Sequence, residues 1–176
     1  LSHRRTLTNA ILRDRAVQLI IEHEANNSRS NSSQIEKKTG EARKYAREIA
    51  AHISYPTVRV VERLLGWVWN RIYDGIVLNH VERLHEIAKD KEIIYVPCHR
   101  SHIDYLLLSY IVIQHGLSLP HVAAGINLNI TVIGAILRRG GAFFLRRSFA
   151  GNRLYAAVFN AYLHEILTRG HSIEYF

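Results

Sequence analysis

A histidine and an aspartate five positions apart, His99 and Asp104, are the residues best suited to acid–base chemistry. On one helix their side chains would point about 140° apart, so they can meet only if a helix begins between them. Ser101 is a suitable N-cap, which leaves His99 in a loop and puts Asp104 on the first turn. Asp104 can then accept a hydrogen bond from one imidazole nitrogen of His99, while the other nitrogen removes a proton from an alcohol. The alcohol attacks an acyl thioester directly, so no acyl-enzyme intermediate is required. The same two residues also occur in loops and first turns for purely structural reasons.

Neighbouring side chains offer two rival interpretations. Cys98 could be a nucleophile activated by a histidine. Adjacent side chains of an extended chain point to opposite faces, however, so we expect Cys98 to be a small buried residue at the end of a strand. His99, His102 and Asp104 could hold a metal ion, but no second cluster of metal-ligand spacing accompanies them. We therefore predict neither a metal nor a cofactor.

Two arginine pairs, Arg138 with Arg139 and Arg146 with Arg147, flank a short apolar run that two glycines open. Arginine binds a phosphate dianion through two parallel hydrogen bonds, and glycine permits close approach of the backbone. A phosphate pocket at either end of this run is therefore a candidate, and a solvated basic surface is the alternative.

The elements around these residues are those of an α/β fold. Short apolar runs predict strands at 93–96, 122–124, 142–145 and 172–176, and helical patterns lie at 103–114 and 153–168. Strands that alternate with helices predict a layered domain with a central sheet flanked by helices. The segment that carries His99 follows a strand expected to be buried and leads into a helix, where such sheets commonly place active sites.

The first half of the chain is predicted to be helical. We expect a helix over 7–25, a polar loop over 26–33, a helix from 34 that ends near Pro56, and another helix over 58–72. Trp67 and Trp69, with arginines nearby, suit a lipid interface, although ordinary packing is the favoured explanation. Three regions follow: a helix and linker over 1–33, a helical region over 34–90, and the α/β domain over 91–176.

The composition favours an anionic partner. The 23 basic and 15 acidic residues give a formal charge of +8, which suits nucleic acid, anionic lipid, a phosphorylated substrate or an acidic carrier protein. A single cysteine excludes an internal disulfide, and no apolar stretch reaches the roughly 18 residues of a membrane-spanning helix. The chain contains no methionine and ends within a predicted strand, so we expect a piece of a longer protein that is truncated at both ends.

Several blocks of the sequence resemble the glycerol-phosphate acyltransferase family. The run VPCHRSHIDYLLLSY at 96–110 is similar to the family's first block, and GAFFLRR at 141–147 is similar to its second. AAGINLN at 123–129 and SIEYF at 172–176 are similar as well, and residues 54–84 resemble the helical region before the catalytic domain of the bacterial membrane-bound members. The resemblance covers residues 34–176.

This resemblance implies roles for particular residues. His99 would be the general base and Asp104 its orienting partner. Gly141, Phe144, Arg146 and Arg147 would belong to the block that binds the phosphate of the acceptor, with Arg147 in direct contact, and Arg139 is a further candidate from the basic pairs. The family's third block begins at Glu174 and continues beyond this chain, so part of the phosphate site is expected to be missing.

The resemblance also implies a reaction and partners. Members transfer an acyl group from acyl-coenzyme A or acyl carrier protein to the sn-1 hydroxyl of glycerol 3-phosphate, without a cofactor, and release lysophosphatidic acid. We expect a peripheral protein on the cytoplasmic face of the bacterial inner membrane that contacts phospholipid and binds no nucleic acid. The alternatives are acylation of dihydroxyacetone phosphate and a non-catalytic basic module that docks on membranes.

Overall fold

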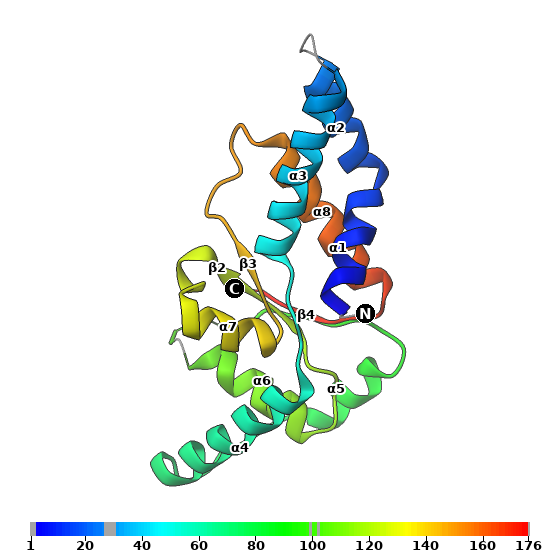
Figure 1. Cartoon of the computed structure of the whole chain (residues 1–176). Coiled ribbons are helices and arrows are strands. Elements are labelled where there is room, and N and C mark those ends of the chain that lie inside the picture. Colours follow the sequence, from blue (N-terminus) through cyan, green and yellow to red (C-terminus); the bar gives the residue numbers. More distant parts are fainter. Residues whose placement is uncertain (1–2, 27–30, 99, 102, 176) are drawn as a thin grey trace.

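The protein is described by a computed structural model that covers residues 3–26, 31–98, 100–101 and 103–175 (Figure 1). Its helices and strands are α1 (His3–Arg13), α2 (Arg15–Asn26), α3 (Asn31–Ile49), α4 (Tyr55–Ile72), α5 (Val81–Ala88), β1 (Ile94–Tyr95), α6 (Asp104–Gln114), β2 (His121–Gly125), α7 (Thr131–Arg139), β3 (Ala142–Leu145), α8 (Arg153–Thr168) and β4 (Ile173–Glu174), with a short 3₁₀ helix, η1 (Ile126–Leu128), after β2. This alternation confirms the predicted α/β class.

The four strands form one parallel sheet in the order β1-β4-β2-β3. The connections from β1 through α6 to β2, and from β2 through α7 to β3, step across the sheet in one direction. The connection from β3 through α8 to β4 steps back, placing β4 between β1 and β2. Crossovers between parallel strands are right-handed. Helices in connections that run in opposite directions along the sheet therefore cover opposite faces. Figure 1 accordingly places α8 on one side of the sheet and α6 and α7 on the other.

The N-terminal helices and α8 form a bundle on the first face of the sheet. α8 contacts α1, α2 and α3, and α3 also contacts β3. The core of the bundle includes Leu7, Ile11, Val17, Ile21, Ala46, Ile49, Leu154, Tyr155, Val158, Tyr162 and Ile166, together with Ala123, Phe143 and Ile173 from the sheet. This one core contains residues from each of the three predicted regions, whose boundaries stay predictions.

The single helix predicted over 7–25 is wrong, because the chain breaks there into α1 and α2. Asp14 lies at the break, and its Oδ1 accepts hydrogen bonds from the backbone N–H groups of Ala16 at 2.9 Å and Val17 at 3.3 Å. An aspartate that accepts these bonds is an N-cap, so Asp14 starts a new helix rather than continuing the old one. The polar loop predicted over 26–33 is wrong at both ends, because α2 extends to Asn26 and α3 begins at Asn31, and residues 27–30 lie outside the described residues.

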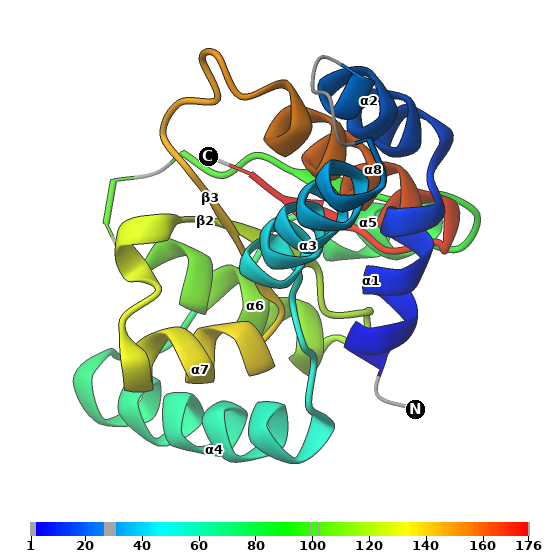
Figure 2. The same ribbon diagram turned by 45° about the horizontal axis from the view of Figure 1, so that its top comes forward.

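Helix α4 packs against α6 and α7 on the second face of the sheet and runs alongside α7 (Figure 2). The helix predicted to end near Pro56 ends earlier, at Ile49, and Pro56 instead stands in the first turn of α4, a position that proline favours. The extended link before it is fixed by two backbone hydrogen bonds, from His52 N to Arg138 O at 3.0 Å and from Ser54 N to Arg139 O at 2.9 Å. The end of α7 therefore sets where α4 begins.

Strand β1 differs from the buried strand that the sequence predicts. It has two residues and lies at the edge of the sheet, and the side chains of Ile94 and Val96 are 61% and 70% exposed. An apolar run alone does not distinguish an edge strand from a central one. No helix in the described parts of the chain is both long and apolar enough to cross a membrane.

Candidate active site

The segment that joins β1 to α6 leaves the sheet at its carboxyl edge, where open α/β sheets place their ligand sites. Asp104 is the first residue of α6, and its Oδ2 accepts hydrogen bonds from the backbone N–H groups of Arg100 and Ser101, both at 2.7 Å. The hydroxyl of Ser101 accepts a hydrogen bond from Ile103 N at 3.2 Å. These bonds direct the Asp104 carboxylate back over the turn that precedes the helix.

The structure thus confirms Asp104 on the first helical turn. The N-cap position is Ile103, so the expectation that Ser101 is the N-cap is wrong. His99 and His102 lie outside the described residues, so the pairing of His99 with Asp104 stays a prediction. The described part of the chain contains no group of three or more His, Cys, Asp or Glu side chains that could hold a metal ion.

Cys98 is exposed, so the expectation of a small buried residue is wrong. The correction has the same cause as that for β1. Since β1 is an edge strand with an exposed end, the residues that follow it leave the sheet without entering the core.

The second block forms β3 and the residues on either side of it. Gly141 has a φ of +102°, and a Cβ at this position would lie 3.0 Å from Pro120 O, so a side chain is excluded both by conformation and by space. Phe144 is fully buried in a small core cluster with Ala124 and Ala142, and the guanidinium of Arg138 lies 4.6 Å from its ring centre. These two residues shape the strand and its packing.

The two arginines after β3 point in different directions. Arg146 makes a bidentate ion pair with Glu48 of α3, through Nε to Oε1 at 2.7 Å and Nη2 to Oε2 at 2.8 Å. Its guanidinium also lies 4.9 Å from the ring centre of Tyr45 and 4.7 Å from that of Tyr155. The hydrogen bonds to Glu48 raise the pKa of Arg146, which stays charged. Arg147 is exposed and has no side-chain partner among the described residues.

The arginines before β3 divide in the same way. The Arg138 guanidinium donates hydrogen bonds to the carbonyls of Glu48 and Ala50 at the end of α3, and burial lowers its pKa to about 10. Arg139 is exposed. Because β3 runs roughly 13 Å between the pairs, the structure brings Arg147 to the carboxyl edge that carries Asp104 and leaves Arg139 at the opposite edge.

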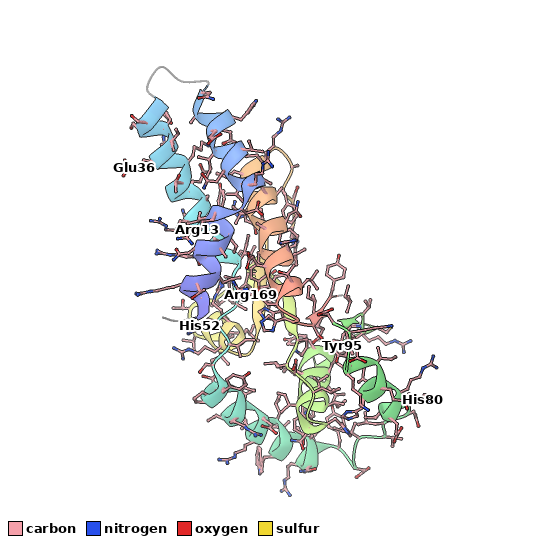
Figure 3. All side chains as sticks on the ribbon, turned by 90° about the vertical axis from the view of Figure 1, so that its right-hand side faces the viewer. Arg13, Glu36, His52, His80, Tyr95 and Arg169 are labelled. Carbon is pink, nitrogen blue, oxygen red and sulfur yellow. The ribbon has the colours of Figure 1, made fainter. Side chains whose placement is uncertain are left out.

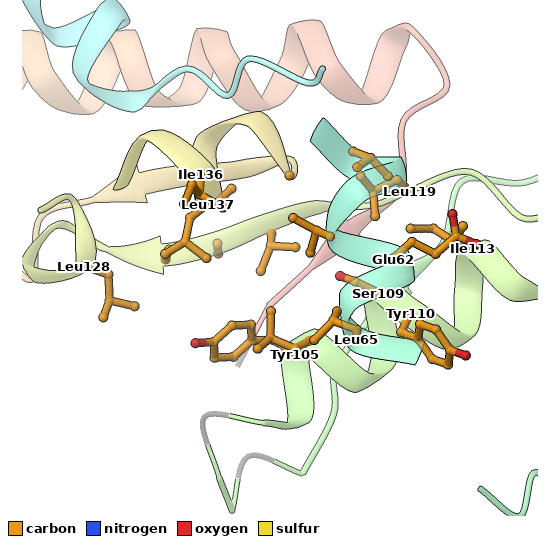
Figure 4. Close-up of a pocket in the computed structure, with 18 of the residues that line it drawn as sticks. Glu62, Leu65, Tyr105, Ser109, Tyr110, Ile113, Leu119, Leu128, Ile136 and Leu137 are labelled. Atoms are coloured by element: carbon orange, nitrogen blue, oxygen red, sulfur yellow. The ribbon is translucent and has the colours of Figure 1, made fainter. Parts of the chain in front are cut away.

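An apolar cavity of about 340 Å³ lies beneath the sheet, between α4, α6, α7 and β2 (Figure 4). Tyr105, directly after Asp104, stands at one end of the labelled lining residues, near the turn that precedes α6 (Figure 4). Burial raises the pKa of this tyrosine. The lining includes Val58, Val61, Leu65, Leu106, Ile113, Leu119, Leu128, Ile136 and Leu137, with Glu62, Ser109, Tyr110 and Asn127 as polar members.

Glu174 was not singled out as a functional residue by the sequence, yet it lies close to the site. Its side chain is fully buried, and neither carboxyl oxygen has a hydrogen-bond partner. Its neighbour Ile173 packs into the bundle, so Glu174 faces the α6 side of the sheet, in register with Tyr95 and Val122. Burial raises the pKa of Glu174 to about 8. A glutamate in an otherwise apolar strand was the available signal.

Comparison with known proteins relates this site to a family. Residues 79–176, more than half of the chain, match the family described as Acyltransferase. The chain is 56% identical over 176 residues to a glycerol-3-phosphate acyltransferase of Pseudomonas paraeruginosa (strain DSM 24068 / PA7). It is 53% identical to that of Pseudomonas fluorescens (strain Pf0-1) and 52% to that of Pseudomonas entomophila (strain L48). These matches cover all of this chain but only 21% of each relative, so the chain spans about a fifth of their length. Since the family match includes Asp104, β3 and the whole sheet, the chain belongs to the acyltransferase family.

Proposed function

We propose that the protein containing this chain transfers an acyl group to the sn-1 hydroxyl of glycerol 3-phosphate and releases lysophosphatidic acid. The observation that carries the proposal is the Asp104 carboxylate, which two backbone N–H groups hold over the turn just after position 99. The family match and the names of the Pseudomonas relatives support the reaction class and the acceptor.

In the proposed mechanism His99 is the general base. It removes the proton from the sn-1 hydroxyl while Asp104 orients the imidazole and stabilises the imidazolium. The hydroxyl oxygen attacks the thioester carbonyl of acyl-coenzyme A or acyl carrier protein, a carbon–oxygen bond forms, and the carbon–sulfur bond breaks. The leaving thiolate takes the proton from the imidazolium. No cofactor is required for this sequence.

Arg147 is the proposed contact for the acceptor's phosphate. It is exposed at the carboxyl edge of the sheet, on the same edge as Asp104, and its charge has no partner among the described residues. Arg146 supports it indirectly, because the ion pair with Glu48 fixes the chain where it leaves β3. Gly141 and Phe144 would act by shaping that strand, and Arg139 is placed too far along it to share the same phosphate.

The apolar cavity is the proposed place of the acyl chain. It has the volume range of small-molecule sites, its lining is mostly aliphatic, and it lies beside Tyr105, the residue after Asp104. An acyl chain that enters there would leave its thioester near the turn of residues 100–104.

The outer surface of α4 is the proposed membrane contact, on the cytoplasmic face of the bacterial inner membrane. Val60, Leu64 and Trp67 are more than half exposed along one stripe, and Arg63 and Arg71 are exposed beside it. Aromatic and aliphatic side chains flanked by cations suit an anionic lipid surface. Trp69, in contrast, is buried against Tyr73, so the two tryptophans divide between lipid contact and packing.

Transfer of labelled acyl groups by the intact parent protein tests the reaction. Glycerol 3-phosphate and dihydroxyacetone phosphate are supplied as competing acceptors, and acyl-coenzyme A as the donor. We expect lysophosphatidic acid as the main product and its near-complete loss in His99→Ala, with a large loss in Asp104→Asn. A His99→Ala protein that keeps its activity would show that the base has been misidentified, and preferential use of dihydroxyacetone phosphate would change the acceptor.

A further inference from the structure

A second hollow, of about 680 Å³, lies on the N-terminal bundle, where α1 meets the end of α3 and the link that follows it. The residues that line it are all basic or polar, and none carries a carboxylate: Arg4, Arg5, Thr8, Asn9, Arg43, Arg47 and His52. Figure 3 labels His52 at the end of the bundle nearest the sheet. The hollow adjoins the end of α7 that leads into β3, at the amino edge of the sheet, whereas Asp104 lies at the carboxyl edge.

The need to cap α3 explains only part of this cluster. Arg4 donates a hydrogen bond to the carbonyl of Arg47, and Arg138 caps the same helix end from α7. Cations at these positions satisfy the last carbonyls and the negative end of the helix dipole. The side chains of Arg5, Arg43 and Arg47 make no ion pair among the described residues, so capping does not account for them.

The arginines of the hollow lie close together although their positive charges repel one another. Burial lowers the pKa of Arg4, and the positive charge of Arg47 lowers it further. Like charges that converge in this way are stabilised when an anion binds between them.

Two buried nitrogens at the hollow lack a hydrogen-bond partner. They are Nε of Arg4 and Nδ1 of His52. The arginine Nε always carries a hydrogen, so it is a buried donor without an acceptor, an arrangement that native proteins rarely leave uncompensated. The lining of the hollow therefore includes a basic side chain whose donors the protein does not fully pair.

We propose that this hollow is a binding site for the phosphate groups of an anionic ligand. Guanidinium groups match phosphate oxygens in pairs, and several converging arginines suit a ligand with more than one negative charge better than a single carboxylate. The phosphates come from a soluble phosphate ester or from the headgroup of an anionic lipid. The site is distinct from the acceptor site at the opposite edge of the sheet.

Calorimetric titration of the full-length protein with inorganic pyrophosphate tests the site. Saturating glycerol 3-phosphate is present so that the acceptor site is already occupied. Arg43 and Arg47 are exposed and cap nothing with their side chains, so Arg43→Gln with Arg47→Gln leaves the fold intact. Because each charged hydrogen bond contributes strongly, we expect pyrophosphate to bind this double variant roughly tenfold or more weakly than the parent.

Arg13→Gln with Arg15→Gln is the matched control, because it removes the same charge from the same bundle. Both residues are exposed and lie outside the hollow, and Figure 3 shows Arg13 farther along the bundle than His52. We expect this control to bind pyrophosphate like the parent. An equal loss of pyrophosphate affinity in the two double variants would overturn the proposed site. So would an unchanged affinity in the Arg43→Gln, Arg47→Gln variant.

Competition identifies the source of the phosphate. Displacement of pyrophosphate by coenzyme A identifies a soluble phosphate ester, and displacement only by vesicles of phosphatidylglycerol and phosphatidylethanolamine identifies a lipid headgroup. Displacement by neither contradicts the proposal. His99→Ala keeps this binding in either case, so a failure of the proposed acyl transfer is distinguishable from a failure of this site.

Discussion

At the scale of single residues, the chain separates side chains of the same type into different tasks. Arg138 and Arg146 turn inward, to the end of α3 and to Glu48, while Arg139 and Arg147 stay exposed. Asp104 is likewise held by two backbone donors. Charge type alone therefore does not tell which arginine meets a substrate.

Adjacent arginines should respond differently to the same substitution. Arg147→Gln is expected to raise the KM for glycerol 3-phosphate about tenfold or more, since a charged hydrogen bond is lost, and to leave the melting temperature unchanged. Arg146→Gln should lower the free energy of unfolding by about 1–2 kcal/mol, because an ion pair and two aromatic contacts disappear. Steady-state kinetics and thermal unfolding of both variants measure this division, and a larger KM effect in Arg146→Gln would reverse it.

The unpaired carboxyl of Glu174 should make stability depend on pH. Its pKa rises from 4.5 to about 8 on folding, so between these values the folded protein binds a proton that the unfolded chain has lost. The contribution of protonated Glu174 to the free energy of unfolding is fully present below pH 4.5. It is lost as the pH rises through 8, by up to about 1.4 kcal/mol per pH unit. Glu174→Gln should therefore gain stability relative to the parent from pH 5 to pH 8.5 in denaturant titrations. A difference independent of pH would contradict an unpaired carboxyl.

At the scale of elements, α6 has two functions that its sequence combines. Its first turn holds the Asp104 carboxylate over residues 100 and 101, and Leu106, Ser109 and Ile113 line the cavity along its length. These α6 side chains form one wall of the cavity, and α4, which packs against α6, supplies the opposite wall.

Narrowing the cavity should shorten the preferred acyl chain. Ser109→Phe adds a ring to the lining, so chains of sixteen carbons lose contacts that chains of ten carbons do not make. We expect the ratio of kcat/KM for long over short acyl-coenzyme A to fall about tenfold. Leu108→Phe, on the same helix but outside the cavity lining, is the control, and an equal shift in both variants would remove the cavity from acyl recognition.

At the scale of the whole molecule, the sheet separates two surfaces. The bundle of α1, α2, α3 and α8 covers one face, and α6 and α7, with α4 packed against them, cover the other (Figure 1). The exposed stripe of α4 is thus on the same side of the sheet as the proposed acyl cavity. A lipid surface against α4 would place the acyl chain and the membrane on the side of α6 and α7, whereas the basic hollow belongs to the bundle.

Membrane binding should depend on the outer surface of α4. Removing two cations from an anionic interface is expected to weaken binding about 30-fold, so Arg63→Gln with Arg71→Gln should partition less onto phosphatidylglycerol-containing vesicles. Trp67→Ser should weaken binding to anionic and neutral vesicles alike. Sedimentation of the full-length protein with vesicles measures both, and acyl transfer in detergent micelles is the control that should stay unchanged. Unaltered sedimentation of these variants would mean that α4 faces protein instead of lipid.

The sequence by itself determined the alternation of strands and helices, the helix over 58–72 and the position of Asp104 on a first turn. Each depends on local chemistry: the period of apolar residues and the hydrogen bonds by which Asp104 joins the turn before its helix. The sequence did not anticipate the break at Asp14, because an apolar period can continue across a capping residue.

The tertiary structure alone decided which side chains meet. The exposure of Ile94 and Cys98, the burial of Phe144 and Glu174, and the inward turn of Arg146 follow from strand order and from the helices that cover each face. Strand order depends on contacts between residues far apart in the chain, such as β4 entering between β1 and β2, and no local pattern carries that information. Candidate site residues can therefore be recognised from the local sequence. The fold decides which of them come together at one edge of the sheet.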